Sequence, residues 1–286
     1  MIQHPAITSG RVAVITGAAS GIGLAAAKRF AGLGLHVWMA DCDKDSLASA
    51  GAEVRAEFPT VTTTTQPTDV SSLESVWSLQ SAVADHYPDV AVLMNNAGVG
   101  GGGHAFEKPD NWRRVLETNL FGVLNAVQAF TQAMIDQGKP AAIINTGSKQ
   151  GITMPPGDTA YNVSKAGIKA LTEGLQHTLR NTPGCQVSAH LLVPGFTFTG
   201  MTRPGAGEKP PAAWTGEQVV GFMLERMASG DFYIICPDND VSRAVDNARM
   251  TWTMQDITQN RPPLSRWHPD YAEAFAAFLK AETGGG

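Results

Sequence analysis

The stretch that decides the fold is TGAASGIG, residues 16–23, which follows the apolar run RVAVI at residues 11–15. An apolar strand that leads through a glycine-rich turn into a helix can bring backbone N–H groups close to a phosphate. Gly17 would allow the tight turn, Gly21 a close approach to a pyrophosphate, and Gly23 the packing of the helix on a sheet. Taken alone, the stretch is equally compatible with an ordinary tight turn.

The rest of the chain alternates short β-rich runs with longer helix-like segments. Most strand candidates are apolar almost throughout, as is typical of parallel strands buried on both faces, whereas the less apolar VTTTTQ is expected at an edge. The strand candidates are residues 11–16, 36–40, 61–66, 90–95, 141–146, 186–193 and 232–236, and the helix candidates are residues 20–33, 43–57, 72–86, 110–137 and 159–181. This alternation predicts an α/β fold, a Rossmann-type doubly wound parallel sheet of about seven strands with helices on both faces.

Size and charge limit the classes of function. The 286 residues are 43% hydrophobic and carry a formal net charge of −5, without a run of lysine or arginine. This balance favours neither nucleic acid nor an anionic membrane as a partner. No apolar run approaches the roughly 18 residues that span a bilayer, and the N-terminal segment lacks the basic start and apolar stretch of a secretion signal. The seven histidines form no metal-binding pair, so no metal site is expected.

The cysteines indicate a compartment. Cys42, Cys185 and Cys236 are widely spaced and odd in number, which favours reduced thiols over a disulfide framework. Together with the absence of a secretion signal, they predict a cytoplasmic protein. Each cysteine is also compatible with the simple role of a small buried hydrophobic residue.

The second strand candidate ends in an acidic residue. Asp41 lies 24 residues after Gly17, where a carboxylate can accept hydrogen bonds from the ribose hydroxyls of an adenosine. A helix N-cap is the alternative role for Asp41. Because no arginine or lysine stands directly beside Asp41 to offset its charge, a 2′-phosphate would be repelled, and NAD is expected rather than NADP.

The segment YNVSK places Tyr161 and Lys165 four residues apart, on one face of a helix. An unperturbed tyrosine has a pKa of about 10, which makes it about 4 kcal/mol too weak an acid for proton transfer at neutral pH. An ammonium about 4 Å away supplies about 4 kcal/mol at an effective dielectric of about 20. The pair therefore predicts a tyrosine whose pKa is lowered by the lysine, suited to deprotonating an alcohol. Taken alone, the Y-x-x-x-K spacing is common, and a solvated helix face is the alternative.

Six motifs together resemble the short-chain dehydrogenase/reductase family. They are TGAASGIG, NNAG (95–98), NLFG (119–122), INTGS (144–148), YNVSK (161–165) and PGFTFT (194–199), in the order and spacing of that family. Ser148 lies 13 residues before Tyr161, as the family pattern requires. The resemblance covers residues 10 to about 200, and less clearly the strand candidate at 232–236. The chain is identified as a member in its NAD-using form, with an extended C-terminal tail.

The resemblance implies four catalytic residues. Tyr161 would be the general acid–base, and Ser148 would hold the substrate oxygen. Lys165 would lower the pKa of the tyrosine and bind the nicotinamide ribose. Asn119 would hold a helix kink and an ordered water that links Lys165 to solvent; the simpler alternative is a polar residue of an ordinary helix.

The resemblance also implies the cofactor, NAD (NADH), and its contacts. NNAG would line the adenosine side, Asp69 and Val70 the adenine, and PGFTFT the nicotinamide, with Thr197 and Thr199 on the carboxamide or pyrophosphate. A helix N-cap is the alternative for Thr199. The cofactor-binding residues so implied are Gly17, Ser20, Gly21, Ile22, Gly23, Asp41, Asp69, Val70, Asn96, Ala97, Gly98, Tyr161, Lys165, Pro194, Gly195, Thr197 and Thr199.

The expected activity is an NAD(H)-dependent oxidoreductase that interconverts a secondary alcohol and a ketone. A catalytically silent cofactor-sensing protein on the same fold is the alternative. An epimerase or dehydratase of the extended relatives is less favoured, because those tend to carry G-x-x-G-x-x-G. The family further implies a homodimer or homotetramer formed through the helices at 110–137 and 159–181, and His104 is expected to be a loop residue.

Residues 1–286 are expected to form a single dinucleotide-binding catalytic domain, with 196–230 as a substrate lid region and 237–286 as a C-terminal extension. An apolar wall at the lid would suit a bulky, apolar or aromatic substrate. Its residues would be Phe196, Phe198, Met201, Trp214, Phe222, Met223 and Met227. The tail adds an apolar stripe at helical spacing, formed by Val241, Val245, Ala248 and Trp252. This stripe either packs in the core or in a contact between subunits, or it forms part of the lid over the substrate.

Overall fold

The computed structural model describes residues 3–200 and 208–284. Within them lies a seven-stranded sheet whose neighbouring strands are all parallel. The strands are β1 (Val12–Thr16), β2 (His36–Asp41), β3 (Thr63–Pro67), β4 (Val90–Asn95), β5 (Ala141–Thr146), β6 (Val187–Val193) and β7 (Tyr233–Ile235), in the order β3-β2-β1-β4-β5-β6-β7. The direction of the order reverses between β1 and β4, where such sheets open a crevice at the carboxyl ends of the strands. The predicted sheet is confirmed, with β3 at an edge.

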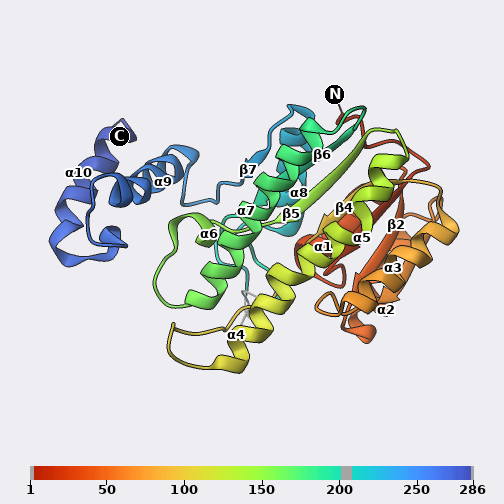
Figure 1. Cartoon of the computed structure of the whole chain (residues 1–286), viewed down its shortest axis with the longest axis horizontal. Coiled ribbons are helices and arrows are strands. Elements are labelled where there is room, and N and C mark those ends of the chain that lie inside the picture. The colour runs from red at the N-terminus through yellow and green to blue at the C-terminus, as the bar shows by residue number, and fades with distance from the viewer. Residues whose placement is uncertain (1–2, 201–207, 285–286) are drawn as a thin grey trace.

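Helices cover both faces of this sheet (Figure 1). The pleat of β1 sends Val12 and Val14 to one face and Ala13 and Ile15 to the other, and both faces are buried. On the Ala13 face lie α1 (Gly21–Gly32), α2 (Lys44–Glu57) and α8 (Gly216–Ala228), and on the Val12 face lie α3 (Leu73–His86), α5 (Gly122–Asp136) and α7 (Thr159–Asn181). Burial on both sides explains why the strands are almost continuously apolar.

The helix predicted over residues 110–137 is interrupted. It consists of α4 (Pro109–Leu116), a π-helical turn η1 (Glu117–Phe121) and α5. A π turn fits an extra residue into the helix and often marks a functional site. Here the turn contains Asn119, a fully buried polar residue.

Part of the predicted apolar wall belongs to the core instead. Met223 and Met227 of α8 are fully buried in the cluster on the Ala13 face, and Trp214 and Phe222 pack against the same cluster. The reason is that a capping box at Thr215 starts a regular helix, which turns its apolar side onto α1 and the sheet. The wall prediction is therefore wrong for Met223 and Met227, while Trp214 and Phe222 stay partly exposed. Met201 lies outside the described residues.

The C-terminal segment extends to one side of the sheet (Figure 1). It contains α9 (Arg243–Thr258), two short 3₁₀ turns, η2 (Ser265–Trp267) and η3 (Pro269–Tyr271), and α10 (Ala272–Glu282). These elements pack around Trp252, whose ring lies 5.3 Å from the ring of Phe275 and 5.2 Å from that of Phe278. Ala248 and Trp252, on the predicted stripe, are buried. The segment meets the body mainly where α9 packs against α6 (Gln150–Thr153).

No helix within residues 3–200 and 208–284 combines the length and apolar character needed to cross a membrane. All three cysteines lie in the described part and are free, with Cys42 exposed, Cys185 half-buried and Cys236 buried. Burial raises the pKa of the Cys236 thiol to about 12. Cys236 therefore behaves as a small hydrophobic residue.

Candidate active site

The glycine-rich turn joins β1 to α1 in a geometry that needs its glycines. Gly17 and Gly21 have φ angles of +64° and +55°, which favour glycine. A Cβ atom at Gly23 would lie 2.1 Å from the carbonyl oxygen of Gly17, so no larger residue fits there. The N-cap Ser20 makes no side-chain capping bond, and the first turn of α1 has no acidic residue. The helix N-terminus thus keeps N–H groups and positive dipole charge for an anion, as a pyrophosphate requires.

Asp41 stands at the end of β2, beside this turn. Its Oδ2 accepts a hydrogen bond from the Ala19 N–H at 3.1 Å, and its Oδ1 accepts one from the Asp43 N–H at 3.1 Å. The N-cap of α2 is Asp43, whose side chain accepts from the Ser46 N–H. The N-cap alternative for Asp41 is therefore wrong. These residues fit a dinucleotide, with the carboxylate next to the turn that would hold the phosphates.

Side chains tie the ends of β1, β4 and β5 together under the turn. Thr16 Oγ1 accepts from the Asn96 N–H at 3.1 Å and from the Ala97 N–H at 3.3 Å. Asn96 Nδ2 donates to the Gly17 carbonyl at 3.2 Å, and a Cβ at Gly17 would lie 2.7 Å from Ala97 Cα. NNAG therefore shapes the glycine-rich turn, a contact that the motif alone did not predict.

The loop after β3 holds Asp69 and Val70. Asp69 Oδ1 accepts from the Ser71 N–H and hydroxyl, which fixes its orientation. Val70 is buried, and its carbonyl accepts from Asn125 Nδ2 at 2.9 Å. A Cβ at Gly122 would lie 2.7 Å from Val70 Cγ2, so the glycine lets α5 approach this loop closely.

Asn119 connects three segments from inside the π turn. Its Oδ1 accepts from the Val99 N–H at 2.7 Å, and its Nδ2 donates to the Val99 carbonyl at 2.9 Å and to Ser164 Oγ at 3.1 Å. It thus fastens the loop after β4 to η1 and α7. A π turn is found where the kink was predicted.

Ser148, Tyr161 and Lys165 come together at the carboxyl end of β5. Tyr161 and Lys165 share a face of α7, and the Lys165 Nζ lies 5.5 Å from the centre of the tyrosine ring. The side chain of Ser148 is hydrogen-bonded to Tyr161. Lys165 is 4% exposed, and its Nζ donates to the Thr146 carbonyl at 2.8 Å.

The pKa values differ from the simple prediction. Burial raises the pKa of Tyr161, the hydrogen bond with Ser148 lowers it in part, and the charge of Asp158 raises it. Burial also lowers the pKa of Lys165 to about 8. The predicted lowering of the Tyr161 pKa by Lys165 is not observed, because the ammonium is directed at the Thr146 carbonyl and is itself desolvated.

Asp158 is a residue of the site that the sequence reasoning missed. It caps α7 by accepting from the Tyr161 N–H at 3.2 Å. The same carboxylate accepts from the N–H groups of Gly101, Gly102 and Gly103 at 2.9–3.2 Å. An aspartate just before a helix is a visible cap signal, and GGGG offers free N–H groups, but nothing local pairs the two. His104 follows in this loop, as expected, and is exposed.

The loop after β6 crosses towards the glycine-rich turn. A Cβ at Gly21 would lie 3.0 Å from Thr199 Cγ2, so the loop reaches the start of α1. Thr197 is buried and forms a β-bridge with Trp214. A Cβ at Gly195 would lie 2.8 Å from the Pro237 carbonyl. The Pro194–Gly195 segment is thus packed against the start of the C-terminal segment.

Lys149, directly after Ser148, was also missed. Its Nζ lies 2.6 Å from Asp246 Oδ2 and 3.4 Å from Asp238 Oδ2. Asp238 Oδ2 also accepts from the Phe196 N–H at 3.3 Å. These bonds join the loops after β5, β6 and β7. In the described part of the chain, no cluster of histidine, cysteine, aspartate and glutamate could hold a metal ion.

The chain is similar to known proteins over most of its length. The family model for short chain dehydrogenase matches residues 11–209. A 1-deoxy-11-beta-hydroxypentalenate dehydrogenase of Streptomyces exfoliatus is 35% identical over 265 residues, covering 90% of this chain and 94% of the relative.

Two solved structures are also similar. A short chain dehydrogenase/reductase from Burkholderia phymatum in complex with NAD has 33% identity and a TM-score of 0.79, covering 92% of this chain and 98% of that one. A metagenomic short-chain oxidoreductase in complex with NADP has 27% identity and a TM-score of 0.67, covering 81% and 98%. Relatives thus bind either dinucleotide. The chain belongs to the short-chain dehydrogenase/reductase family, whose members are oxidoreductases that bind a nicotinamide cofactor.

Proposed function

We propose that the protein is an NAD(H)-dependent oxidoreductase that interconverts a secondary alcohol and a ketone. The observation that carries this proposal is the meeting of Ser148, Tyr161 and Lys165 at the end of β5. A catalytically silent sensor would have no need for a buried lysine beside a half-buried tyrosine, since desolvation of both groups costs stability.

Each residue has a distinct task. Ser148 Oγ is placed to hydrogen-bond the oxygen of the substrate, because it already bonds Tyr161. The Tyr161 hydroxyl exchanges a proton with that oxygen, giving it to a ketone on reduction and taking it from an alcohol on oxidation. The cofactor supplies or receives the hydride. Lys165 adds positive charge below the ring, and Asn119 holds the π turn that borders α7.

The choice of NAD rests on Asp41. Its two oxygens are anchored by backbone N–H groups, so the carboxylate stays at the end of β2 beside the glycine-rich turn. A 2′-phosphate on the adenosine ribose would meet this negative charge at short range. One similar structure contains NAD, which supports this choice, and another contains NADP. The preference of this protein for NAD over NADP is therefore to be measured.

The substrate is proposed to be a bulky apolar or aromatic compound. Phe196 lies in the loop after β6, and 41% of it is exposed, which leaves apolar surface for a substrate. A name among the relatives, 1-deoxy-11-beta-hydroxypentalenate dehydrogenase, refers to a hydroxyl-bearing substrate. We further propose that the described segments act as one catalytic unit, with the residues of the C-terminal extension next to the substrate.

A spectrophotometric screen tests the proposal. NADH oxidation is followed with small and bulky ketones, and NAD reduction with the matching alcohols. We expect turnover with bulky ketones or alcohols, and weaker turnover with NADPH or NADP. NADH binding without turnover of any ketone or alcohol would instead support the cofactor-sensing alternative.

A further inference from the structure

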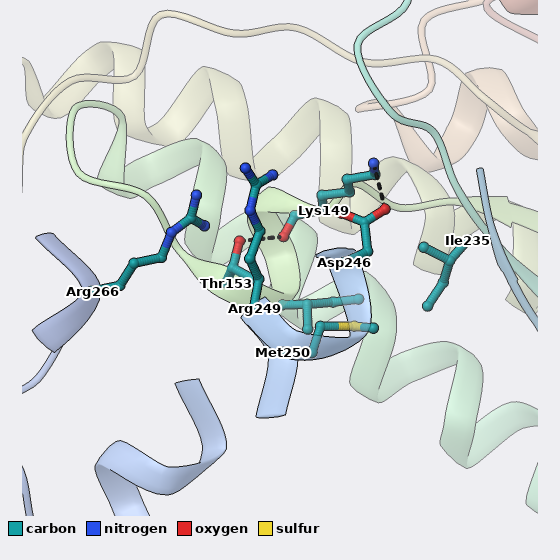
Figure 2. A pocket seen from close by; sticks show the side chains of 8 residues that line it. Lys149, Thr153, Ile235, Asp246, Arg249, Met250 and Arg266 are labelled. Atoms are coloured by element: carbon teal, nitrogen blue, oxygen red, sulfur yellow. Dashed lines mark hydrogen bonds and ion pairs between the residues drawn. The ribbon is translucent and has the colours of Figure 1, made fainter. Parts of the chain in front are cut away.

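A cavity of about 50 Å³ lies where the C-terminal extension meets the body. Figure 2 shows it between α6 and α9, with Arg266 reaching in from η2. Its lining residues are Lys149, Ile152, Thr153, Ile235, Asp246, Arg249, Met250 and Arg266. Figure 2 shows Arg249 between Arg266 on one side and Lys149 and Asp246 on the other, and Ile152, Ile235 and Met250 provide apolar surface.

The cavity lies close to the catalytic residues through α6. Ser148 directly precedes Lys149, and Ile152 and Thr153 of α6 line the cavity. A Cβ at Gly151 would lie 2.5 Å from the carbonyl group of Lys165, so α6 rests directly on the catalytic part of α7. A single turn of helix therefore contacts both the catalytic lysine and the cavity.

The charges around the cavity are unbalanced. It is lined by three cations, Lys149, Arg249 and Arg266, and by one carboxylate, Asp246. Lys149 pairs with Asp246 at 2.6 Å and with Asp238 at 3.4 Å. Lys149 is thus shared between two carboxylates, and with the two guanidinium groups included the cluster has one positive charge in excess.

Asp246 attracts these two guanidinium groups only from a distance. Within residues 3–200 and 208–284, neither forms an ion pair, and the Nε of Arg249, shielded from solvent, has no hydrogen-bond partner. Burial and the charge of Arg249 lower the pKa of Arg266 to about 10. Arg266 is held in place by Phe275, whose ring centre is 5.3 Å from its guanidinium carbon, and by Trp267 at 4.7 Å. The two half-buried like charges repel each other, and an anion in addition to Asp246 would stabilise them.

We propose that Arg249 and Arg266 form a binding site for a carboxylate group. A planar guanidinium offers paired N–H donors that match the two oxygens of a carboxylate. The apolar residues Ile152, Ile235 and Met250 suit the carbon atoms attached to it, and the volume suits a small group. The carboxylate belongs either to the substrate or to a separate ligand. If the carboxylate belongs to the substrate, the substrate is a keto acid or hydroxy acid, and this case rests on the proposed function. If the carboxylate belongs to a separate ligand, the site does not depend on the proposed function.

Binding is tested first without catalysis. The melting temperature of the full chain is measured with sodium acetate, with sodium chloride at equal ionic strength, and with acetamide as the neutral isostere. We expect acetate alone to raise the melting temperature by about 1–3 °C at several times its Kd. Arg249→Gln and Arg266→Gln should each weaken acetate binding about tenfold or more, since each removes a charge-assisted pair of donors.

The control is Arg180→Gln, an exposed arginine at the end of α7, which should keep the full acetate shift. Arg249→Lys and Arg266→Lys keep the positive charge and should keep part of the acetate-induced shift in melting temperature. If a glutamine variant loses the shift only because it folds poorly, comparison with the lysine variant reveals this. The proposal is overturned by a wild-type protein that responds equally to acetate, chloride and acetamide. It is also overturned by glutamine variants that respond to acetate as the control does.

A kinetic arm distinguishes the two sources. NADH oxidation is measured with 4-oxo-4-phenylbutanoate and with its methyl ester. A substrate carboxylate predicts that Arg249→Gln raises KM for the acid about tenfold and leaves KM for the ester unchanged, and that acetate competes with the acid only. A separate ligand predicts that acetate changes both rates alike. Failure of the proposed function would appear as no turnover of any ketone, while the acetate shift would be unaffected.

Discussion

At the scale of single residues, the proposed proton transfer depends on the hydroxyl of Tyr161. We predict that Tyr161→Phe lowers turnover by roughly 10² or more, because the proton donor and acceptor is lost. NADH binding, followed by fluorescence, should stay nearly unchanged, since the ring remains. Tyr271→Phe, in the C-terminal extension, is the matched control. Turnover close to that of the wild type in Tyr161→Phe would rule out its assigned role.

The raised pKa of Tyr161 gives the reaction a pH dependence. Alcohol oxidation needs the deprotonated tyrosine, so its kcat/KM should rise as the pH increases above neutrality, whereas ketone reduction should fall. The hydrogen bond with Ser148 lowers this pKa, so Ser148→Ala should move the rise to higher pH as well as reduce the rate. A pH–rate profile of both proteins checks this. An unchanged profile in the residual activity of Ser148→Ala would contradict it.

The buried ammonium of Lys165 should lower the free energy of unfolding. Its pKa is lowered by burial from 10.5 to about 8, so between these values the unfolded chain binds more protons than the folded one. The unfolding free energy should therefore rise as the pH increases from about 8 to 10.5. Urea unfolding at several pH values measures this rise, and Lys165→Met, which has no ammonium, should lack it. An equal slope in both proteins would show that other groups cause it.

Asp41 is predicted to set the choice of cofactor. The wild type should favour NAD over NADP in kcat/KM, and Asp41→Ala should narrow that preference by about 1–3 kcal/mol, as the loss of one nearby repulsive charge allows. Asp41→Asn removes the charge and keeps the shape of the side chain. It therefore separates the loss of charge repulsion from the loss of the hydrogen bond that positions Ala19. A wild type that already prefers NADP would disprove this role.

At the scale of elements, α7 and the glycine loop before α4 share one anchor. Asp158 caps α7 and binds three backbone N–H groups of residues 101–103. We predict that Asp158→Ala lowers stability by about 2–3 kcal/mol, more than a helix cap alone, because several hydrogen bonds are lost. Ser72→Ala, which removes only the cap of α3, should cost about 1 kcal/mol. Chemical denaturation measures both, and equal losses would mean that the loop contacts contribute nothing.

At the scale of the whole molecule, the C-terminal extension has its own apolar cluster around Trp252. Deletion of residues 262–286 removes Arg266, Phe275 and Phe278, and with them most of that cluster. We expect loss of activity on large substrates, with NADH binding and oligomeric state intact, because the extension meets the body chiefly at α6. Activity assays, fluorescence and gel filtration are the measurements. Insoluble protein would instead indicate that the extension closes the core.

Assembly is predicted to use the helices at residues 110–137 and 159–181. Phe121 and Val163 on these helices are 48% and 44% exposed, which leaves apolar surface for a partner copy. Gel filtration should therefore show a homodimer or homotetramer, and Val163→Asp should shift it towards the monomer. A monomeric wild type would contradict the prediction.

The sequence by itself determined the parts that depend on neighbouring residues. The tight turn at Gly17, the strand–helix alternation and the shared face of Tyr161 and Lys165 all follow from local geometry, so short patterns predicted them. The edge position of β3 followed from its polarity. Most element bounds differ from the predicted ranges only at the ends, where helices fray and caps compete.

Only the tertiary structure decided what depends on distant contacts. The Lys165 ammonium binds the Thr146 carbonyl, 19 residues away, and Asp158 binds the glycine loop, 55 to 57 residues away. Local pattern cannot show such pairs, because chain distance says nothing about which loops a sheet brings together. The burial of Met223 and Met227 and the meeting of Arg249 with the loop after Ser148 have the same origin. The free energy of these contacts depends on desolvation, which exists only once the chain is folded.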